Sequence, residues 1–223
     1  EDVALALFDV ENNGDLDIYF AHGSGQFSPN SFAYDDKLWI NDGKGNFTQA
    51  AISLPNSGEN SSCVKPGDFD GDGDLDLFIG NRGVPGQYPV ASRSYLLENK
   101  STSTEIVFTD ASDKLSTGEN ALGLVTDALW TDFNNDGWQD LIVTGDWMPI
   151  LFFKNQKGNL VQMEHTGIEW ASGWWKSIAP SDLDNDGDLD YIVGNFGKNT
   201  FYKAQPDMPM TILAKDFDQN GSV

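Results

Sequence analysis

The sequence predicts an all-β fold, a β-propeller or a fragment of one, built from four-stranded antiparallel blades. Three observations support this fold class. A nine-residue Asp-rich pattern recurs along the chain, a short apolar run follows each complete copy, and hairpin patterns occur between the copies. Self-similarity at intervals of tens of residues is typical of repeat architectures, and four-stranded units repeated radially are propeller blades.

The Asp-rich pattern occurs four times in full and begins a fifth time at Asp216, where the chain stops at Val223 before the ninth position. We therefore expect a piece of a longer protein. Successive copies start 59, 64, 50 and 34 residues apart, and the short last interval indicates that the fourth unit could lack a strand. The complete copies are DVENNGDLD from Asp9, DFDGDGDLD from Asp68, DFNNDGWQD from Asp132 and DLDNDGDLD from Asp182.

About four strands are expected in each unit. Apolar runs without alternation after the complete copies indicate strands buried on both faces: Ile18-Tyr19-Phe20, Leu77-Phe78-Ile79, Leu141-Ile142-Val143 and Tyr191-Ile192-Val193. Hairpins are predicted from turn residues between short apolar segments, in LWINDGKGNFTQ from Leu38, LFFKNQKGNLVQ from Leu151 and, more loosely, YLLENKSTSTEIVF from Tyr95. The sequence thus predicts a single domain or fragment over 1–223, with approximate blades 1–60, 61–123, 124–173 and 174–208 and the start of a fifth at 209–223.

Composition argues against several function classes. The chain has 13 Lys and Arg against 35 Asp and Glu, a net charge of −22 that repels nucleic acid and anionic lipid and favours cations or basic partners. No apolar run approaches the roughly 20 residues that a membrane-spanning helix needs, so we expect no membrane insertion. Cys63 is the one cysteine, so neither an internal disulfide nor a thiolate metal site is expected.

Each Asp-rich copy is a candidate calcium loop. Calcium prefers oxygen ligands, and a loop that turns around a centre can direct the side chains of positions 1, 3, 5 and 9 inward, while position 7 offers its carbonyl. We expect about four to five Ca²⁺ sites. The side-chain ligands of the complete copies are predicted to be Asp9, Glu11, Asn13, Asp17, Asp68, Asp70, Asp72, Asp76, Asp132, Asn134, Asp136, Asp140, Asp182, Asp184, Asp186 and Asp190. The position-7 residues are Asp15, Asp74, Trp138 and Asp188, and the incomplete copy offers Asp216, Asp218, Asn220 and Ser222.

Other positions of the copies support a metal loop over a simple turn. Position 6 is Gly in every copy, which fits a sharp turn with positive φ. An EF-hand would need a bidentate Glu at position 12, where these copies carry Phe20, Ile79, Val143 and Val193. One copy alone would be interpreted as a solvated turn, but five in one frame favour metal binding. The role expected for calcium is structural, and because calcium is abundant outside cells we expect an extracellular, cell-surface or periplasmic protein.

The strings GDFDGDGDLDLFIGN and SDLDNDGDLDYIVGNFG resemble FG-GAP or VCBS-type repeats, the units of integrin α-subunit propellers and of many bacterial surface proteins. Within that group, the spacing and the LLEN and FFKN hairpins resemble the secreted cartilage-acidic-protein (ASPIC-type) branch and its bacterial relatives. The resemblance implies a seven- or eight-bladed propeller in which calcium is held between the first two strands of a blade. Glu11, Asn13 and Asn134 depart from the Asp of the family pattern, which puts the affinity of the first and third loops in doubt.

A partner is expected on the face opposite the calcium loops, because strands of a blade alternate in direction. That face would gather aromatic and basic groups able to stack on sugar rings or hold an acidic ligand; the alternative is that the Trp residues pack between blades. The candidate ligand residues are Arg82, Tyr88, Arg93, Trp147, Trp170, Trp174 and Trp175.

Three hypotheses for function follow. The first is a non-catalytic extracellular recognition or adhesion module, stabilised by calcium, that binds a protein or glycan. The second is a polysaccharide-degrading enzyme, although the chain lacks motifs such as HExxH and GxSxG. The third is a carbohydrate-binding domain of a larger surface protein.

Overall fold

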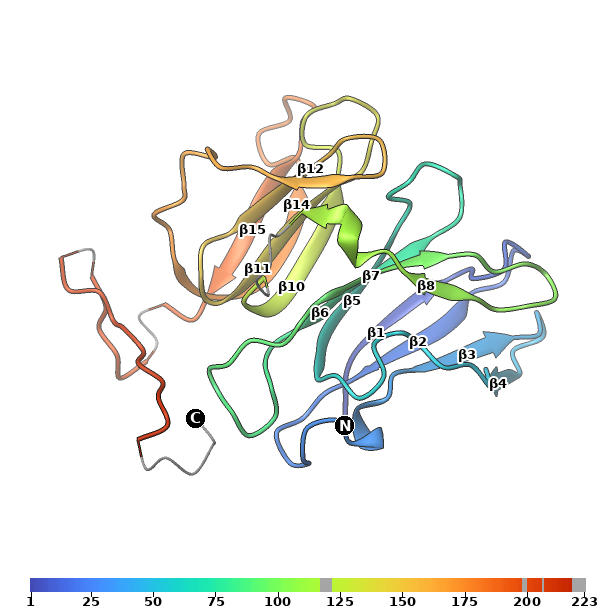
Figure 1. The fold of residues 1–223 in the computed structure, drawn as a ribbon. Helices are drawn as coiled ribbons and strands as arrows, with labels where there is room; N and C mark the ends of the chain where they lie inside the picture. Colours follow the sequence, from blue (N-terminus) through green and yellow to red (C-terminus); the bar gives the residue numbers. More distant parts are fainter. Residues whose placement is uncertain (117–121, 198–199, 206, 218–223) are drawn as a thin grey trace.

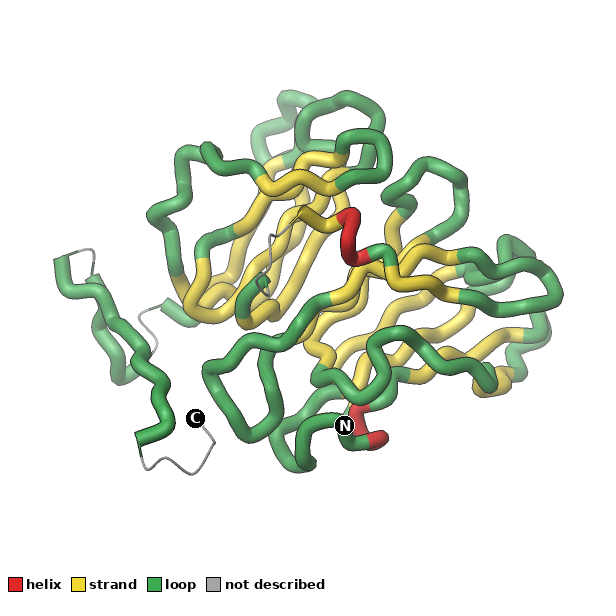
Figure 2. The backbone as a smooth tube through the Cα atoms, viewed as in Figure 1, coloured by secondary structure: helices red, strands yellow, loops and turns green. Residues whose placement is uncertain are grey.

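A computed structural model describes residues 1–116, 122–197, 200–205 and 207–217 and shows an all-β protein (Figure 1). Figure 2 shows that strands and long connecting loops make up nearly all of the described chain. Two short 3-10 turns, η1 (Phe32–Tyr34) and η2 (Ser112–Lys114), are the helical segments of these ranges. The predicted all-β class is therefore confirmed.

The first two units each form a four-stranded antiparallel sheet whose strands follow one another in chain order. The first sheet consists of β1 (Asp2–Phe8), β2 (Asp17–His22), β3 (Lys37–Asn41) and β4 (Phe47–Gln49). The second consists of β5 (Ser61–Gly67), β6 (Asp76–Asn81), β7 (Tyr95–Asn99) and β8 (Phe108–Asp110). The hairpins predicted at Leu38 and Tyr95 are the β3–β4 and β7–β8 pairs.

The third unit has the expected four antiparallel strands and gains one more at its outer edge. The four are β10 (Leu124–Thr131), β11 (Asp140–Met148), β12 (Leu151–Asn155) and β13 (Leu160–Gln162). The added strand, β9 (Leu115–Ser116), comes from the preceding connection and pairs parallel to β13. In the described residues the fourth unit consists of β14 (Gly173–Ser181) and β15 (Asp190–Asn195).

The first strands of successive units lie side by side, so the sheets form a fan (Figure 1). β1 packs against β5, β5 against β10, and β10 against β14. This arrangement is compatible with a propeller, in which the first strand of each blade lies nearest the axis. The described strands do not close a ring.

The core consists of apolar layers between neighbouring units. Phe8 and Tyr19 of the first unit pack with Leu77 of the second, and Phe78 of the second packs with Phe153 of the third. All five side chains are at most 2 % exposed. Burying one such side chain stabilises the fold by about 1.5–3 kcal/mol, so the contacts between sheets are the main source of stability.

The two ends of the fan expose apolar side chains that inner sheets bury. β6 is buried along its whole length, as its unalternating sequence predicts. The equivalent β15 leaves Ile192 53 % exposed, because no further sheet of the described chain covers it. At the opposite end, Leu5 and Leu7 of β1 are 59 % and 55 % exposed.

A buried carboxylate fastens the first unit to the second. Asp36 accepts hydrogen bonds from the Tyr19 hydroxyl at 2.9 Å, the His22 backbone N–H at 2.6 Å, the Asn56 amide at 2.7 Å and the Ser61 hydroxyl at 2.9 Å. Burial raises the pKa of Asp36 to about 6, although these donors act in the opposite direction. The folded state thus favours the protonated form of Asp36 more strongly than the unfolded state does.

We predict that an Asp36→Asn variant gains stability relative to the wild type as pH rises from 4 to 7. The stabilisation associated with protonated Asp36 is fully present below the unfolded pKa and is lost as pH rises through about 6, whereas the amide does not titrate. The relative gain should be on the order of 1–3 kcal/mol. Urea unfolding at several pH values measures it. Asp113→Asn, at an exposed carboxylate, is the matched control, and a constant difference across this range would contradict the prediction.

Candidate functional site

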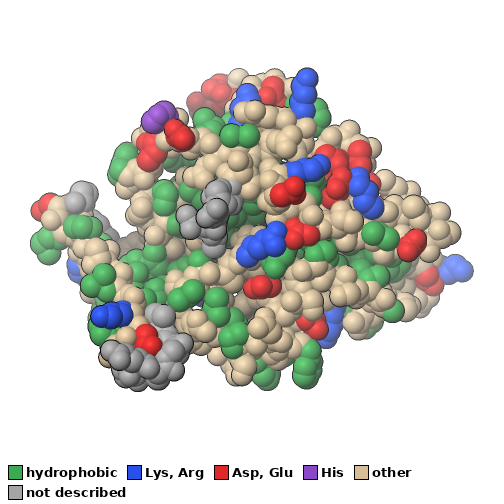
Figure 3. Space-filling model, viewed as in Figure 1, with side chains coloured by type: hydrophobic (Ala, Val, Ile, Leu, Met, Phe, Trp, Pro, Cys, Tyr) green, Lys and Arg blue, Asp and Glu red, His purple; other side chains and the backbone are tan. Residues whose placement is uncertain are grey.

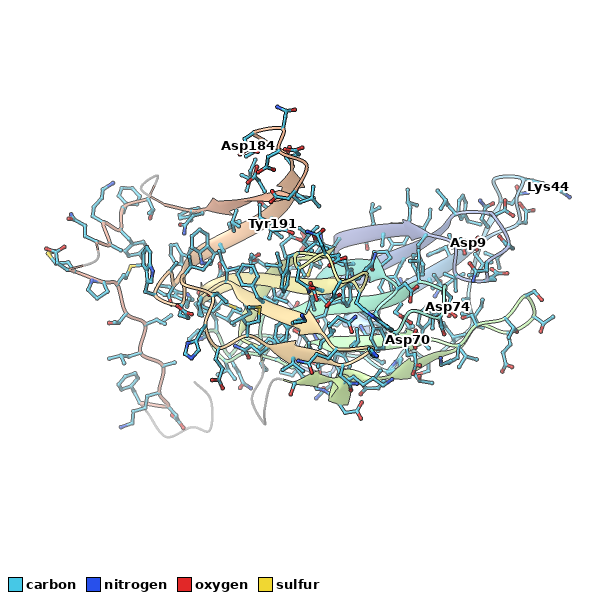
Figure 4. All side chains as sticks on the ribbon, turned by 90° about the horizontal axis from the view of Figure 1, so that it is seen from above. Asp9, Lys44, Asp70, Asp74, Asp184 and Tyr191 are labelled. Atoms are coloured by element: carbon cyan, nitrogen blue, oxygen red, sulfur yellow. The ribbon has the colours of Figure 1, made fainter. Side chains whose placement is uncertain are left out.

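The Asp-rich loops join the first and second strands of every unit. They span the short connections between β1 and β2, β5 and β6, β10 and β11, and β14 and β15. In Figure 4, Asp9, Asp70 and Asp184 lie in three of these loops, beyond the ends of strands. Each loop therefore occupies the same place in its unit.

Side-chain oxygens at positions 1 and 5 shape each loop by accepting hydrogen bonds from its backbone; they belong to carboxylates except at Asn13 of the first loop. Asp68 at position 1 accepts from the Gly73 N–H at 3.2 Å, and Asp72 at position 5 accepts from the Asp74 N–H at 3.2 Å. The fourth loop repeats both bonds through Asp182 and Asp186. These oxygen atoms therefore face the backbone N–H groups of their own loop.

Two positions in each loop require a left-handed backbone. At position 6, Gly14, Gly73, Gly137 and Gly187 have φ between +88° and +96°, and an added Cβ would meet nothing within 4 Å. The backbone angle, not a lack of space, therefore selects glycine. Position 4 has φ between +54° and +77°, which sequence reasoning missed although the four complete copies carry only Asn or Gly there: Asn12, Gly71, Asn135 and Asn185.

The position-9 carboxylate is a buried anchor as well as a candidate ligand. Asp76 accepts from the Phe69 N–H at 3.1 Å and from the Asn99 N–H at 2.8 Å, which ties together the loop, β6 and β7. Asp140 does the same with Phe133 and Asn155 in the third unit. The sequence predicted these aspartates only as ligands.

Asn99 and Asn155 extend this anchoring to the neighbouring unit. The Asn99 amide donates to the carbonyl oxygen of Val10 in the first loop at 2.9 Å, and also to Leu75 in its own unit at 3.2 Å. The buried Asn155 amide likewise bonds the Phe69 carbonyl of the second loop at 2.7 Å. Adjacent Asp-rich loops are therefore connected through one side chain.

The second and fourth loops gather carboxylates most closely. The oxygens of Asp68, Asp70 and Asp76 lie within 4.8 Å of one another, as do those of Asp182, Asp184 and Asp190. Among the described residues these are the acidic trios that could hold a metal ion. Oxygen-only sets of this kind suit a hard cation such as calcium.

The electrostatics of the second loop favour a cation. Burial raises the pKa of Asp76 to about 7 and that of Asp74 to about 6, with the neighbouring Asp72 adding to the latter. A buried oxygen of Asp74 has no hydrogen-bond partner. The Lys100 ammonium lies 3.5 Å from Asp72 and supplies part of the missing positive charge. In the space-filling view, red acidic groups lie beside blue basic ones at several places (Figure 3).

The first and third loops differ in ways that follow from their substitutions. Glu11 replaces the shorter Asp in the first loop, and one of its buried carboxylate oxygens has no hydrogen-bond partner. In the third loop, the Asn134 amide donates to Asp140 at 2.7 Å, so it acts as a neutral partner of the anchor. At position 7, Trp138 lies with its ring against Gly71 of the second loop, where an added Cβ would come within 3.0 Å. Of the fifth copy, Asp218, Asn220 and Ser222 lie outside the described residues, and Asp216 lies within them.

Comparison with known protein families finds the FG-GAP-like repeat in two segments, residues 9–79 and 132–193, which together cover more than half of the chain. The chain belongs to the FG-GAP-like repeat family. The matched segments begin at the first and third Asp-rich loops. FG-GAP repeats are typical of extracellular proteins and often bind calcium, which agrees with the coarse sequence-based expectations. No curated protein matches the chain, and among the described residues no helix has the length and apolar character needed to cross a membrane.

A pocket lies at the end of the sheets opposite the FG-GAP loops. It encloses about 460 Å³ where the starts of the first strands meet the ends of the second strands. Two basic residues from different units line it, together with small, polar and aromatic groups. Lining residues include Val3, Ser62, Arg82, Tyr88, Thr126 and Lys176.

Only some of the predicted ligand residues line the pocket. Arg82 and Tyr88 line the pocket, and the Trp147 indole N–H bonds the Tyr88 hydroxyl at its rim. Arg93 instead pairs with Asp110 at 3.0 Å on the outer edge of the second sheet. Lys176, which the sequence did not single out, is also part of the lining.

The remaining three predicted Trp residues lie on or near the fourth unit. Trp174 packs edge-on against Trp147 with ring centroids 4.8 Å apart, and against Phe196 at 5.3 Å. Trp175 belongs to the apolar layer between the third and fourth units. Trp170 lies in a loop with 80 % of its surface exposed.

We predict that Asn155→Ala destabilises the fold by about 2–3 kcal/mol, because it leaves the buried carbonyl of Phe69 and the partly buried carbonyl of Gln139, in two neighbouring loops, without this donor. Asn46→Ala removes an exposed amide that bonds only its own turn and should cost less than about 0.5 kcal/mol. Urea unfolding at fixed calcium measures both. Equal losses for the two variants would show that Asn155 has no special anchoring role.

Proposed function

We propose that this FG-GAP protein is a calcium-stabilised, non-catalytic recognition or adhesion module whose sheets are blades of a β-propeller. The observation that carries the proposal is the pair of carboxylate trios at equivalent places in the second and fourth units. Recurrence at one structural position is what a repeated cation site requires, and it is not expected of solvated turns.

Charge provides the physical reason for calcium. Carboxylates about 4 Å apart repel by about 4 kcal/mol at an effective dielectric constant of 20. The raised pKa values of Asp74 and Asp76 reflect burial first and this crowding second. A divalent ion would relieve the repulsion and hold the ends of two strands together, which makes its role structural.

The partner would bind on the face opposite the loops, at the pocket. This face offers Arg82 and Lys176 on a chain of net charge −22, together with exposed aromatic rings. The fold of each unit leaves the loops at one end and the pocket at the other. Recognition at the pocket therefore leaves the candidate calcium ligands unoccupied by the partner.

Calcium should raise the melting temperature, and excess EDTA should lower it. At about 100 times its dissociation constant, an ion that binds only the folded state stabilises by roughly 2.7 kcal/mol per site. Asp70→Asn and Asp184→Asn should each reduce the calcium-dependent gain, because each removes one charge from a trio. Thermal unfolding with and without calcium measures these effects.

Asp113→Asn removes the same charge at an exposed position outside the loops and should keep the full gain. Melting curves of the wild type that are identical in calcium and in EDTA would rule out the structural role. Turnover of polysaccharides by the pure protein, abolished by substitutions in its pocket, would rule out the non-catalytic assignment.

A further inference from the structure

We propose that the pocket opposite the loops binds the carboxylate of an acidic sugar, held by Arg82 and Lys176 within a ring of bulged residues. The inference rests on the proposed recognition role and names its ligand class. It follows from the backbone irregularities of the first strands, the charge balance of the pocket and its aromatic rim.

Every first strand carries a one-residue irregularity at the same place. In each pairing between first and second strands, the register shifts around one residue that lies six positions before the Asp-rich loop. All four of these residues line the pocket, and bulges of this kind redirect a side chain from the regular ladder. They are Val3, Ser62, Thr126 and Lys176.

Two of the ring residues also fix the positions of neighbouring units. The Ser62 hydroxyl donates to the Val125 carbonyl at 2.7 Å, and the Thr126 hydroxyl donates to the Trp175 carbonyl at 2.8 Å. Because the hydroxyl hydrogens are used in this way, the oxygen lone pairs remain to accept hydrogen bonds. The hydroxyl groups of a sugar are suitable donors.

The pocket has an excess of positive charge. The buried Asp146 accepts from the Arg82 Nε at 3.0 Å and from the Lys176 ammonium at 2.5 Å. Two cations thus share one carboxylate, and their side chains remain 49 % and 40 % exposed. Asp146 acts as a positioning residue that holds both cations, while an anion from solution can balance the remaining charge.

An aromatic rim lies beside these cations. Tyr88 lines the pocket and is 48 % exposed, and its hydroxyl is fixed by the Trp147 N–H. Trp147 has φ of +63°, an uncommon angle for a bulky residue, and directly follows Asp146. Strained backbone of this kind concentrates at binding sites.

These features together favour an acidic sugar over a neutral one. A sugar ring offers an apolar face for Tyr88 and hydroxyl donors for the ring oxygens, and its carboxylate pairs with Arg82 and Lys176. The volume of about 460 Å³ lies within the range of small-ligand pockets. The net charge of −22 on the whole chain would repel an anion that found no such local cations.

The test is calorimetric titration of the folded, calcium-saturated protein with digalacturonate and with its neutral counterpart, digalactose. Digalacturonate should bind at least about tenfold more tightly, and Lys176→Met should remove that difference through loss of a charged hydrogen bond. Lys44→Met, in the turn between β3 and β4 (Figure 4), should keep it. Val3→Glu places a carboxylate in the ring and should also abolish binding, whereas the neutral Val3→Thr should not.

Equal affinity for the two sugars, or retained preference in Lys176→Met, would overturn the inference. Tighter binding of an acidic peptide of alternating Asp and Gly would overturn the assignment to a sugar. The proposed calcium role is judged separately by melting, so a protein that calcium stabilises but that binds no digalacturonate would refute only this inference. Circular dichroism of each variant confirms that it is folded before titration.

Discussion

The structure depends on a buried carboxylate at the start of the second strand in each of the first three units, Asp17, Asp76 and Asp140. Asp76 and Asp140 each accept two backbone N–H groups, one from the Asp-rich loop and one from the third strand. One side chain thereby sets the loop conformation, the start of a strand and the register of the next hairpin. The cost of burying its charge appears in the pKa of Asp76, raised to about 7, and a cation in the loop would offset that cost.

The same strands separate two electrostatic environments. At one end they carry loops in which carboxylates crowd together, and at the other they carry bulged residues, Lys176 among them, that line the pocket together with Arg82. A strand has two ends, so repetition of one unit brings all the loops to one face and all the bulges to the other. The separation of acidic loops and bulged residues onto opposite faces therefore follows from repetition of one unit.

Local patterns in the sequence predicted the positions of the loops, the strands after them and the hairpins, because each depends on residues within about a dozen positions. The predicted burial on both faces fails at β15, where no described sheet covers Ile192. The parallel pairing of β9 with β13 could not be predicted, since it joins segments over 40 residues apart with little pattern of their own. The hydrogen bonds to Asp36 could not be predicted for the same reason, since the donors come from β2, β5 and the connection before β5. Lys176 was missed because it sits in an otherwise aromatic stretch, although its fixed distance from the Asp-rich loop is visible once the units are aligned.

The distance between loops and pocket limits what calcium can do for binding. Asp132 lies six positions after Thr126, which corresponds to about 20 Å at 3.3 Å per residue. A bound ion would not touch a ligand in the pocket, and over that distance its charge is screened by salt. The ion would therefore contribute to the free energy of folding. This contribution reaches the four bulged residues because each lies in a first strand that pairs with the second strand of its unit. Calcium would then control how many molecules can bind, while the pocket itself controls how tightly each one does.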